Sequence, residues 1–229
     1  MNIHKNTRLV LSVVIEGLLL AGLFLLLYGT SEVARADPAV LFVSAAGSGT
    51  ACSQDQPCNL QTALAQATDG DTIYVAQGTY TGTGASVITI TRSITLCGGW
   101  DSSTITPPRR DPNAYPTTLD GEGQRRVVYI SGSITATLEG FTVTNGVAPI
   151  QGAGLYAQNA YLTLRDMTFY SNVISTTVTG DPYGGGAAVE GGTLHVDAST
   201  FWANSVWAAR GPHGGGLAIS DTLVATVEN

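Results

Sequence analysis

The chain is almost free of lysine. Lys5 is the only lysine among 229 residues, so arginine supplies nearly all of the positive charge. From Asp37 onward, seven arginines face 15 aspartates and glutamates, which gives a net charge of 7 − 15 = −8. Nucleic acids and anionic membranes are bound through many cationic contacts. The composition therefore argues against both as partners, and we expect no membrane insertion by this part of the chain.

Cysteine is also scarce, with three residues that all follow the first 36. Cys52 and Cys58 bracket a polar, turn-forming stretch, and the further Cys or His residues that a metal site needs are missing nearby. An exported chain meets oxidising conditions, so we predict a Cys52–Cys58 disulfide. Cys97 lies in an alternating run and is expected to be a small, unpaired strand residue.

Only one stretch of the chain is apolar for long, and it lies at the N-terminus from Gly17 to Tyr28. A basic segment precedes it, and Ala34-Arg35-Ala36 follows it as a cleavage site of the A-x-A type. The alternative is a membrane anchor from Leu9 to Tyr28, but Glu16 interrupts it and leaves a short apolar core. We therefore predict a signal peptide over residues 1–36 and a secreted or cell-surface protein.

Helical periodicity is convincing only once after the signal. Asn59 is a suitable N-cap for a short helix through Thr68 that has one apolar face. The remaining chain is rich in Gly, Thr, Val and Ser in short alternating runs, which favours strands and tight turns. We predict one all-β domain over residues 37–229, with residues 37–71 as a cap whose helix covers the first strand layer.

Several segments alternate apolar and polar residues and are predicted as strands. A proline-rich segment, residues 101–124, breaks this pattern and is predicted as a long loop with a short strand and turn at Thr118 to Gly121. The predicted strands are Val40 to Ser44, Thr72 to Val75, Ser86 to Thr91, Ser93 to Cys97, Arg126 to Ser131 and Ser133 to Val143.

The second half of the chain repeats three short segments at a nearly constant offset, 214 − 184 = 30 for one of them and 194 − 162 = 200 − 168 = 32 for the other two. Such a period, without helical spacing, is typical of a β-solenoid, in which each coil buries its apolar face against its neighbours. The chain reaches Asn229 where another copy is due, so we expect a fragment of a longer protein. The segments are Gly184-Gly185-Gly186 with Gly214-Gly215-Gly216, Leu162-Thr163-Leu164 with Leu194-His195-Val196, and Thr168-Phe169-Tyr170-Ser171-Asn172 with Thr200-Phe201-Trp202-Ala203-Asn204.

Equivalent residues of a parallel solenoid lie about 4.8 Å apart in successive coils, so identical residues stack. Phe169 over Phe201 predicts an aromatic stack in the core. Asn172 over Asn204 predicts an amide ladder at a turn, where asparagine tolerates a left-handed φ. An earlier copy is expected over residues 141–145, although its phenylalanine is four residues from its asparagine instead of three.

The paired Gly-Gly and Phe-x-x-Asn tetrapeptides resemble the polymorphic outer membrane protein repeats of bacterial surface proteins. They cover about residues 140–229. More broadly, the chain is similar to the right-handed parallel β-helices of the pectin-lyase-like superfamily. This resemblance implies a right-handed parallel β-helix and an exported protein. It leaves two functions open, an adhesion or spacer module and a carbohydrate-active enzyme, because a fold does not determine a function.

Charged residues form one outward-facing column in the predicted sheet, Glu139, Arg165, Asp197 and Glu228. Lyases of the superfamily hold calcium with acidic residues and abstract a proton with a basic one, which needs clustered carboxylates and a poised base. Here Arg165 separates two acids, which indicates a surface ion-pair ladder. Only Asp197 beside Glu228 resembles a calcium site. We therefore predict no catalytic residue, no resident metal and no cofactor.

The loops that precede each Gly-Gly segment vary most, and they bring aromatic and cationic residues to one edge. Such mixtures occur at binding surfaces, although exposed aromatic residues also arise without a function. We predict a candidate patch for a carbohydrate or for a surface protein of a host or neighbouring cell. Missing C-terminal sequence is expected to supply any anchor. The patch comprises Tyr183, Trp207, Arg210 and His213, whereas His195 between two threonines has no acid–base partner in the pattern.

Overall fold

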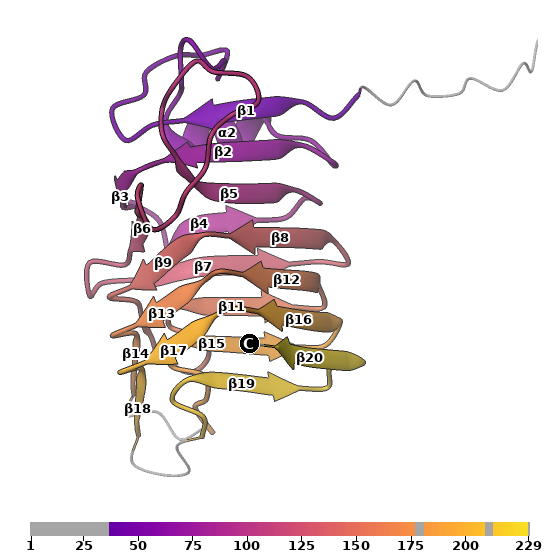
Figure 1. Ribbon diagram of the computed structural model, residues 1–229. Helices are drawn as coiled ribbons and strands as arrows, with labels where there is room; N and C mark the ends of the chain where they lie inside the picture. The colour runs from indigo at the N-terminus through magenta and orange to yellow at the C-terminus, as the bar shows by residue number, and fades with distance from the viewer. Residues whose placement is uncertain (1–36, 177–180, 209–212, 229) are drawn as a thin grey trace, which may run out of the picture. The chain divides into compact units, whose positions relative to one another are not determined.

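The computed structural model describes residues 37–176, 181–208 and 213–228, and its strands coil into a parallel β-helix (Figure 1). Pro38–Asn229 forms one compact unit. The named strands pair only in parallel and fall into four sheets, which we call A to D. Signal cleavage stays a prediction, because residues 1–36 lie outside the described residues. The predicted all-β fold with one short helix is confirmed.

From β2 onward the chain visits sheets A, B and C in turn in each coil, and sheet D joins between B and C in the later coils. Sheet A contains β1 (Val40–Val43), β2 (Thr72–Ala76), β5 (Thr95–Trp100), β8 (Thr135–Glu139), β12 (Tyr161–Arg165), β16 (Thr193–Asp197) and β20 (Val224–Glu228). Sheet B contains β3 (Gly78–Tyr80), β6 (Thr117–Asp120), β9 (Phe141–Thr144), β13 (Thr168–Tyr170) and β17 (Thr200–Trp202).

Sheet C contains β4 (Ser86–Ile90), β7 (Arg126–Ser131), β11 (Leu155–Gln158), β15 (Ala187–Glu190) and β19 (Leu217–Ser220). Sheet D contains β10 (Val147–Ala148), β14 (Val173–Thr176) and β18 (Ser205–Ala208).

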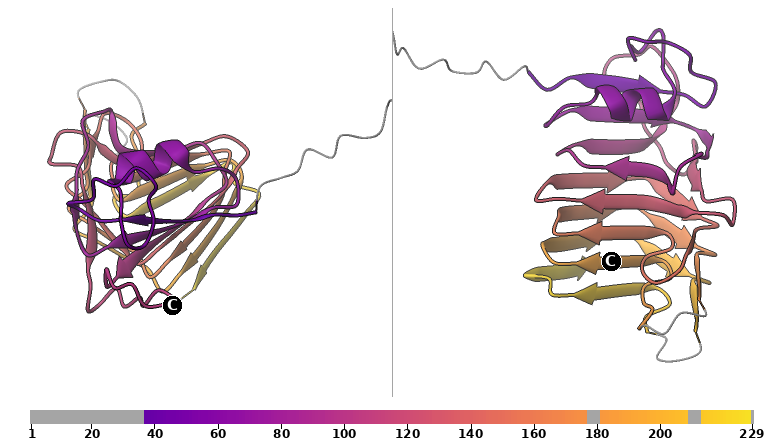
Figure 2. Two further views of the ribbon diagram at one scale, coloured as in Figure 1. Left: turned by 90° about the horizontal axis from the view of Figure 1, so that it is seen from above. Right: turned by 180° about the vertical axis from the view of Figure 1, so that it is seen from behind.

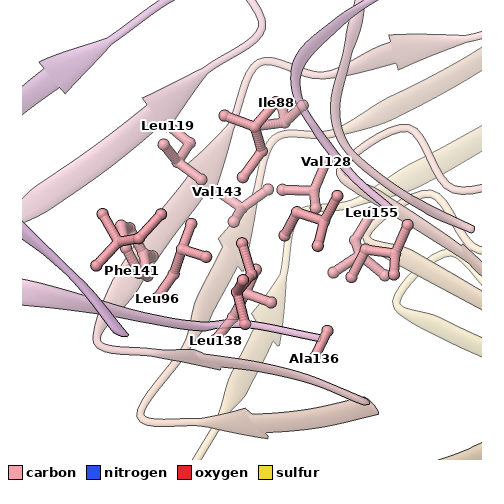
Figure 3. Packing of buried hydrophobic residues seen from close by; sticks show 14 of the residues in the cluster. Ile88, Leu96, Leu119, Val128, Ala136, Leu138, Phe141, Val143 and Leu155 are labelled. Carbon is pink, nitrogen blue, oxygen red and sulfur yellow. The ribbon is translucent and has the colours of Figure 1, made fainter. Parts of the chain in front are cut away.

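The core lies inside the coil because strand residues alternate in direction. Leu138 of sheet A, Val143 of sheet B and Val128 of sheet C are fully buried and converge in the interior (Figure 3). Successive coils keep their register, so that Phe169 pairs with Phe201 and Leu162 with Leu194. The repeat offset, 201 − 169 = 194 − 162 = 32, therefore corresponds to one coil.

A short helix, α2 (Leu60–Gln66), covers the first coil (Figures 1 and 2). Asn59 caps it by accepting a hydrogen bond of 2.8 Å from the backbone N–H of Thr62. The side chains of Leu60 and Ala63 on this helix are buried. The helix ends at Gln66, two residues before the predicted Thr68. Among the described residues, no helix is long and apolar enough to cross a membrane.

Asp71 ties this cap to the coils. Its buried carboxylate accepts hydrogen bonds of 2.7 Å from the backbone N–H groups of Ala39 and Thr68, and one of 3.1 Å from the Thr68 hydroxyl. Burial alone would raise the pKa of Asp71, but these hydrogen bonds outweigh it and hold the pKa below its usual value. The carboxylate thus stays ionised and fixes the residue before β1.

The predicted disulfide is present, since Cys52 and Cys58 are bonded with their Cα atoms 4.6 Å apart. Cys97 is a free, buried thiol, and burial raises its pKa to about 11.

We expect no cysteine of the folded protein to react with an alkylating reagent at neutral pH. After unfolding without a reductant, only Cys97 should be labelled, because its thiol is then exposed while the other two stay bonded. Mass spectrometry of the peptides checks both results. Labelling at Cys52 or Cys58 without a reductant would show that the disulfide does not form.

Two predicted segments differ in detail from the structure. Residues 133–143 form two strands, β8 and β9, because the chain turns at Gly140 with φ +75°. A Cβ atom there would lie 2.7 Å from the Pro112 ring. The earlier repeat copy is also shifted, since Val143 and not Phe141 pairs with Phe169. The extra residue in that copy therefore moves its pattern out of register.

The left-handed φ that was predicted for the asparagines of the ladder lies one residue earlier in the structure. Neither Asn172 nor Asn204 has a positive φ; the residues before them do, with φ +55° at Ser171 and +52° at Ala203. The asparagine side chains instead point inward and bond the neighbouring coils. The recurrence of asparagine at these two positions is therefore explained by the hydrogen bonds of its buried side chain, and not by its backbone conformation.

Candidate binding site

The charged column lies on the outer face of sheet A in the predicted order, with Arg165 paired in register to Glu139 and Asp197. Arg165 is 3.3 Å from Asp197 and 3.9 Å from Glu139. Arg110, from the loop between β5 and β6, adds an ion pair of 2.9 Å to Glu139, which the sequence pattern did not indicate.

Arginine thus pairs with Glu139 and Asp197 of the column. Glu228 lies beside Asp197 in register, but the described residues contain no group of three or more His, Cys, Asp or Glu that could hold a metal ion. His195 lies between Thr163 and Thr226 on the same face. The column is a surface ion-pair ladder, which contributes little to stability for each pair.

The structure describes three members of the predicted loop patch, Tyr183, Trp207 and His213. Tyr183 and His213 are neighbours in adjacent coils, joined by a parallel bridge, and the Tyr183 hydroxyl accepts a hydrogen bond of 2.8 Å from Gln151. Trp207 lies on β18 of sheet D, where it pairs with Ser175. Arg210 lies outside the described residues.

A different cluster forms on the outer face of sheet C around Arg126, the first residue of β7. Its Nε donates to the carbonyl oxygen of Gly152 at 2.9 Å, and its Nη2 donates to that of Gln151 at 2.8 Å. The guanidinium carbon lies 5.7 Å from the ring centre of Tyr129 and 5.1 Å from that of Tyr156. Two backbone carbonyls and two aromatic rings therefore hold the guanidinium in place.

Arg126 has no carboxylate partner among the described residues, in contrast to Arg110 and Arg165. Burial lowers the pKa of its guanidinium, which still remains protonated at neutral pH. A guanidinium has five N–H donors, and the hydrogen bonds to the two carbonyls use two of them. The remaining donors can bind an oxyanion in the forked geometry that arginine favours.

The two tyrosines extend the cluster toward β15. Tyr129 and Tyr156 stack with ring centres 5.9 Å apart, and the buried Tyr156 hydroxyl donates to Oε2 of Glu190 at 2.5 Å. Burial, the hydrogen bond to Glu190 and the charge of that residue all raise the pKa of Tyr156. Its phenol is therefore protonated at neutral pH and serves as a donor, not as a base.

A cleft of about 490 Å³ adjoins this cluster between α2, the loop before β4 and the start of β7. Its walls carry hydroxyl, amide and aromatic groups, and Arg126 is the one charged residue among the described residues that line it. The lining residues are Gln61, Thr83, Gly84, Ala85, Ser86, Val87, Thr89, Arg126 and Tyr129.

The repeat pattern of the sequence does not predict this cluster, because the early coils do not keep the period of the later ones. Tyr129 pairs in register with Tyr156, an offset of 156 − 129 = 27, whereas Tyr156 pairs with Ala188, an offset of 188 − 156 = 32. The sequence does contain one signal, the alternation of apolar and polar residues from Arg126 to Ser131. This alternation predicts that Tyr129 points outward, because Val128 and Ile130 on either side of it point inward.

No curated protein and no solved structure matches the chain. A family model does match residues 45–209, which is 209 − 45 + 1 = 165 of the 229 residues. The matched range includes Arg126, both tyrosines of the cluster and Glu190. The chain therefore belongs to the family described as Protein of unknown function (DUF1565).

Proposed function

We propose that the protein is an exported β-helix binding module whose Arg126 cleft holds a carbohydrate that carries an acidic group. The observation that carries this proposal is a half-buried guanidinium, without a carboxylate partner among the described residues, at the edge of a cleft of about 490 Å³. Export rests on the predicted signal peptide over residues 1–36.

The cleft wall suits a sugar. Thr83, Ser86 and Thr89 offer hydroxyl groups that both donate and accept hydrogen bonds. Gln61 is fixed by a hydrogen bond of 2.7 Å from its Nε2 to the carbonyl oxygen of Val87. Tyr129 adds an aromatic surface of the kind that binding sites use with a few placed polar groups. The acidic group of the ligand would lie against Arg126, where its charge is neutralised.

The protonated phenol of Tyr156 favours binding over catalysis. A lyase needs a base that removes a proton, whereas the raised pKa keeps this phenol protonated and Glu190 already accepts its hydrogen. The arginine is a poor proton acceptor at its normal pKa. The cluster therefore supplies donors and charge, which hold a ligand without transforming it.

Replacing Arg126 with Gln should weaken the binding of an oligogalacturonate by about tenfold to a hundredfold. A hydrogen bond to a charged group contributes about 1.5–3 kcal/mol, and about 1.4 kcal/mol corresponds to a tenfold change in affinity. Titration calorimetry of the secreted protein gives the dissociation constants.

The N-terminal residue of the secreted protein, identified by mass spectrometry, should be Asp37 if the signal peptide is cleaved after residue 36 as predicted.

The matched control is Arg109→Gln, which removes a positive charge from the largely exposed side chain that lies 3.9 Å from Asp101. This variant should bind like the parent protein. Equal loss in both variants would indicate unspecific charge attraction and contradict the proposal. Formation of an unsaturated product during the titration would instead identify the protein as a lyase.

A further inference from the structure

A second surface lies where sheets B and D meet, away from the Arg126 cleft. We call it the B–D corner and define it by Asp120, Glu122, Val147, Val173, Trp202 and Trp207. It combines exposed tryptophans with a separate cleft of about 450 Å³.

Both tryptophans are held in place although they are exposed. Trp202 is 53% exposed and stacks on Tyr170 with ring centres 4.9 Å apart. Trp207 is 69% exposed, and its indole N–H donates to the Ser205 hydroxyl at 2.9 Å. Between them, the Asn204 amide donates to the Phe169 carbonyl oxygen at 2.9 Å and fixes the turn. The two rings are therefore presented on a rigid corner.

The cleft of the corner has an acidic end and an apolar floor. Asp120, Glu122 and Asn145 line the polar end, and Val147 and Val173 line the floor, with no basic residue among the described residues of the lining.

Trp207 lies on β18, one coil beyond Val173 of this cleft. Val173 pairs in register with Ser205, whose hydroxyl holds the Trp207 indole, and paired strands lie about 4.8 Å apart. The Trp207 indole thus belongs to the coil next to the apolar floor.

The charges of the corner select a cationic partner. Asp120 accepts hydrogen bonds from the Glu122 backbone N–H at 2.7 Å and from the Asn145 amide at 3.1 Å, and a carboxylate has about four acceptor sites. Glu122 is paired with Arg125 at 3.4 Å, which leaves Asp120 as the carboxylate without a cation among the described residues. The acidic ligand of the Arg126 cleft would be repelled here.

We propose that the B–D corner docks a basic segment of a partner protein. One arginine or lysine side chain of the segment would enter the cleft toward Asp120. A second would lie against the indole face of Trp207, because β6 and β18 are three coils apart. Indole is the best aromatic partner for a cation, and tryptophan is enriched among the residues that dominate binding energy. The net charge of −7 for the whole chain attracts such a partner over a longer range.

An arginine–glycine repeat peptide tests the proposal, with serine–glycine and glutamate–glycine repeats of equal length as comparison peptides. Calorimetry should show that the arginine–glycine peptide binds and that the other two peptides do not. Its binding should weaken as the salt concentration rises. We expect Trp207→Ala to weaken it about tenfold or more, as for a residue that dominates an interface. Asp120→Asn, which keeps the side-chain size, should weaken it about threefold or more.

Two control variants remove similar groups elsewhere. Tyr161→Ala removes a 48% exposed aromatic residue from sheet A, and Asp55→Asn removes an exposed carboxylate from the disulfide loop. Both should bind the peptide like the parent protein, and oligogalacturonate binding should be unchanged in all four variants. Equal binding of the serine–glycine peptide, or equal losses in controls and corner variants, would overturn the proposal.

Discussion

Replacing Phe169 with Ala should lower the free energy of unfolding by about 3–5 kcal/mol, the usual cost of removing a buried phenylalanine ring. Phe169 is fully buried and stacks on Phe201 with ring centres 4.7 Å apart and parallel planes. Val143 pairs with it on the other side. The substitution removes the middle member of a column, so the coils on both sides lose contacts.

The matched control is Phe201→Ala in the next coil. That ring is only partly buried, so its removal should cost clearly less. Urea unfolding followed by circular dichroism gives both values, provided that the slopes of the transitions agree. A change in slope would indicate that the coils no longer unfold together, which repeat proteins permit. Equal losses at the two positions would contradict the assigned burial.

The later coils were predictable because identical residues stack. Phe169 with Phe201 and Asn172 with Asn204 recur at the offset of one coil, and the structure pairs the two phenylalanines in register. A fixed offset between unlike segments constrains the fold strongly, since one coil length must satisfy all of them. The predicted cap also needed only local information, because an N-cap and one apolar face define a short helix.

The early coils were not predictable in detail because their length varies. Thr95 pairs with Thr137, an offset of 137 − 95 = 42, since the loop over residues 101–116 is inserted between β5 and β6. Val128 pairs with Leu155 at the much shorter offset of 155 − 128 = 27. No common period then aligns the columns, so the approach of Arg126 to Tyr156 was not visible in the sequence.

The candidate sites also depend on groups that carry no sequence signal. Arg126 is fixed by the backbone carbonyls of Gln151 and Gly152, and any residue type has such a carbonyl. Arg110 reaches Glu139 from an irregular loop whose path alternation does not describe. The predicted patch stays a prediction, because Arg210 lies outside the described residues. Its members share a loop region, but Trp207 belongs to β18 of a separate sheet.

Replacing Asn172 with Ala should lower the free energy of unfolding by about 3 kcal/mol or more, because a buried donor or acceptor left unpaired costs about 1–3 kcal/mol. The fully buried Asn172 amide donates to the carbonyl oxygen of Val143 and to Oδ1 of Asn204, each at 2.9 Å. Its Oδ1 accepts the backbone N–H of Gly146 at 2.9 Å. The buried Val143 carbonyl oxygen and the buried Gly146 N–H thus lose a partner together, and Asn204 Oδ1 keeps only the backbone N–H of residue 172.

Asn172→Asp separates hydrogen bonding from packing, because the two side chains have nearly the same size. The carboxylate can still accept from Gly146, but it places a negative oxygen against the Val143 carbonyl and Asn204 Oδ1, so the loss should be at least as large as for alanine.

Asn113→Ala, at an exposed position, is the matched control and should change stability by less than about 0.5 kcal/mol. Urea unfolding gives the three values, and hydrogen exchange at the Gly146 amide should accelerate more in Asn172→Ala, in which that N–H has lost its acceptor, than in Asn172→Asp, in which it keeps one. A loss at Asn172 no larger than at Asn113 would mean that the amide ladder does not hold the coils together.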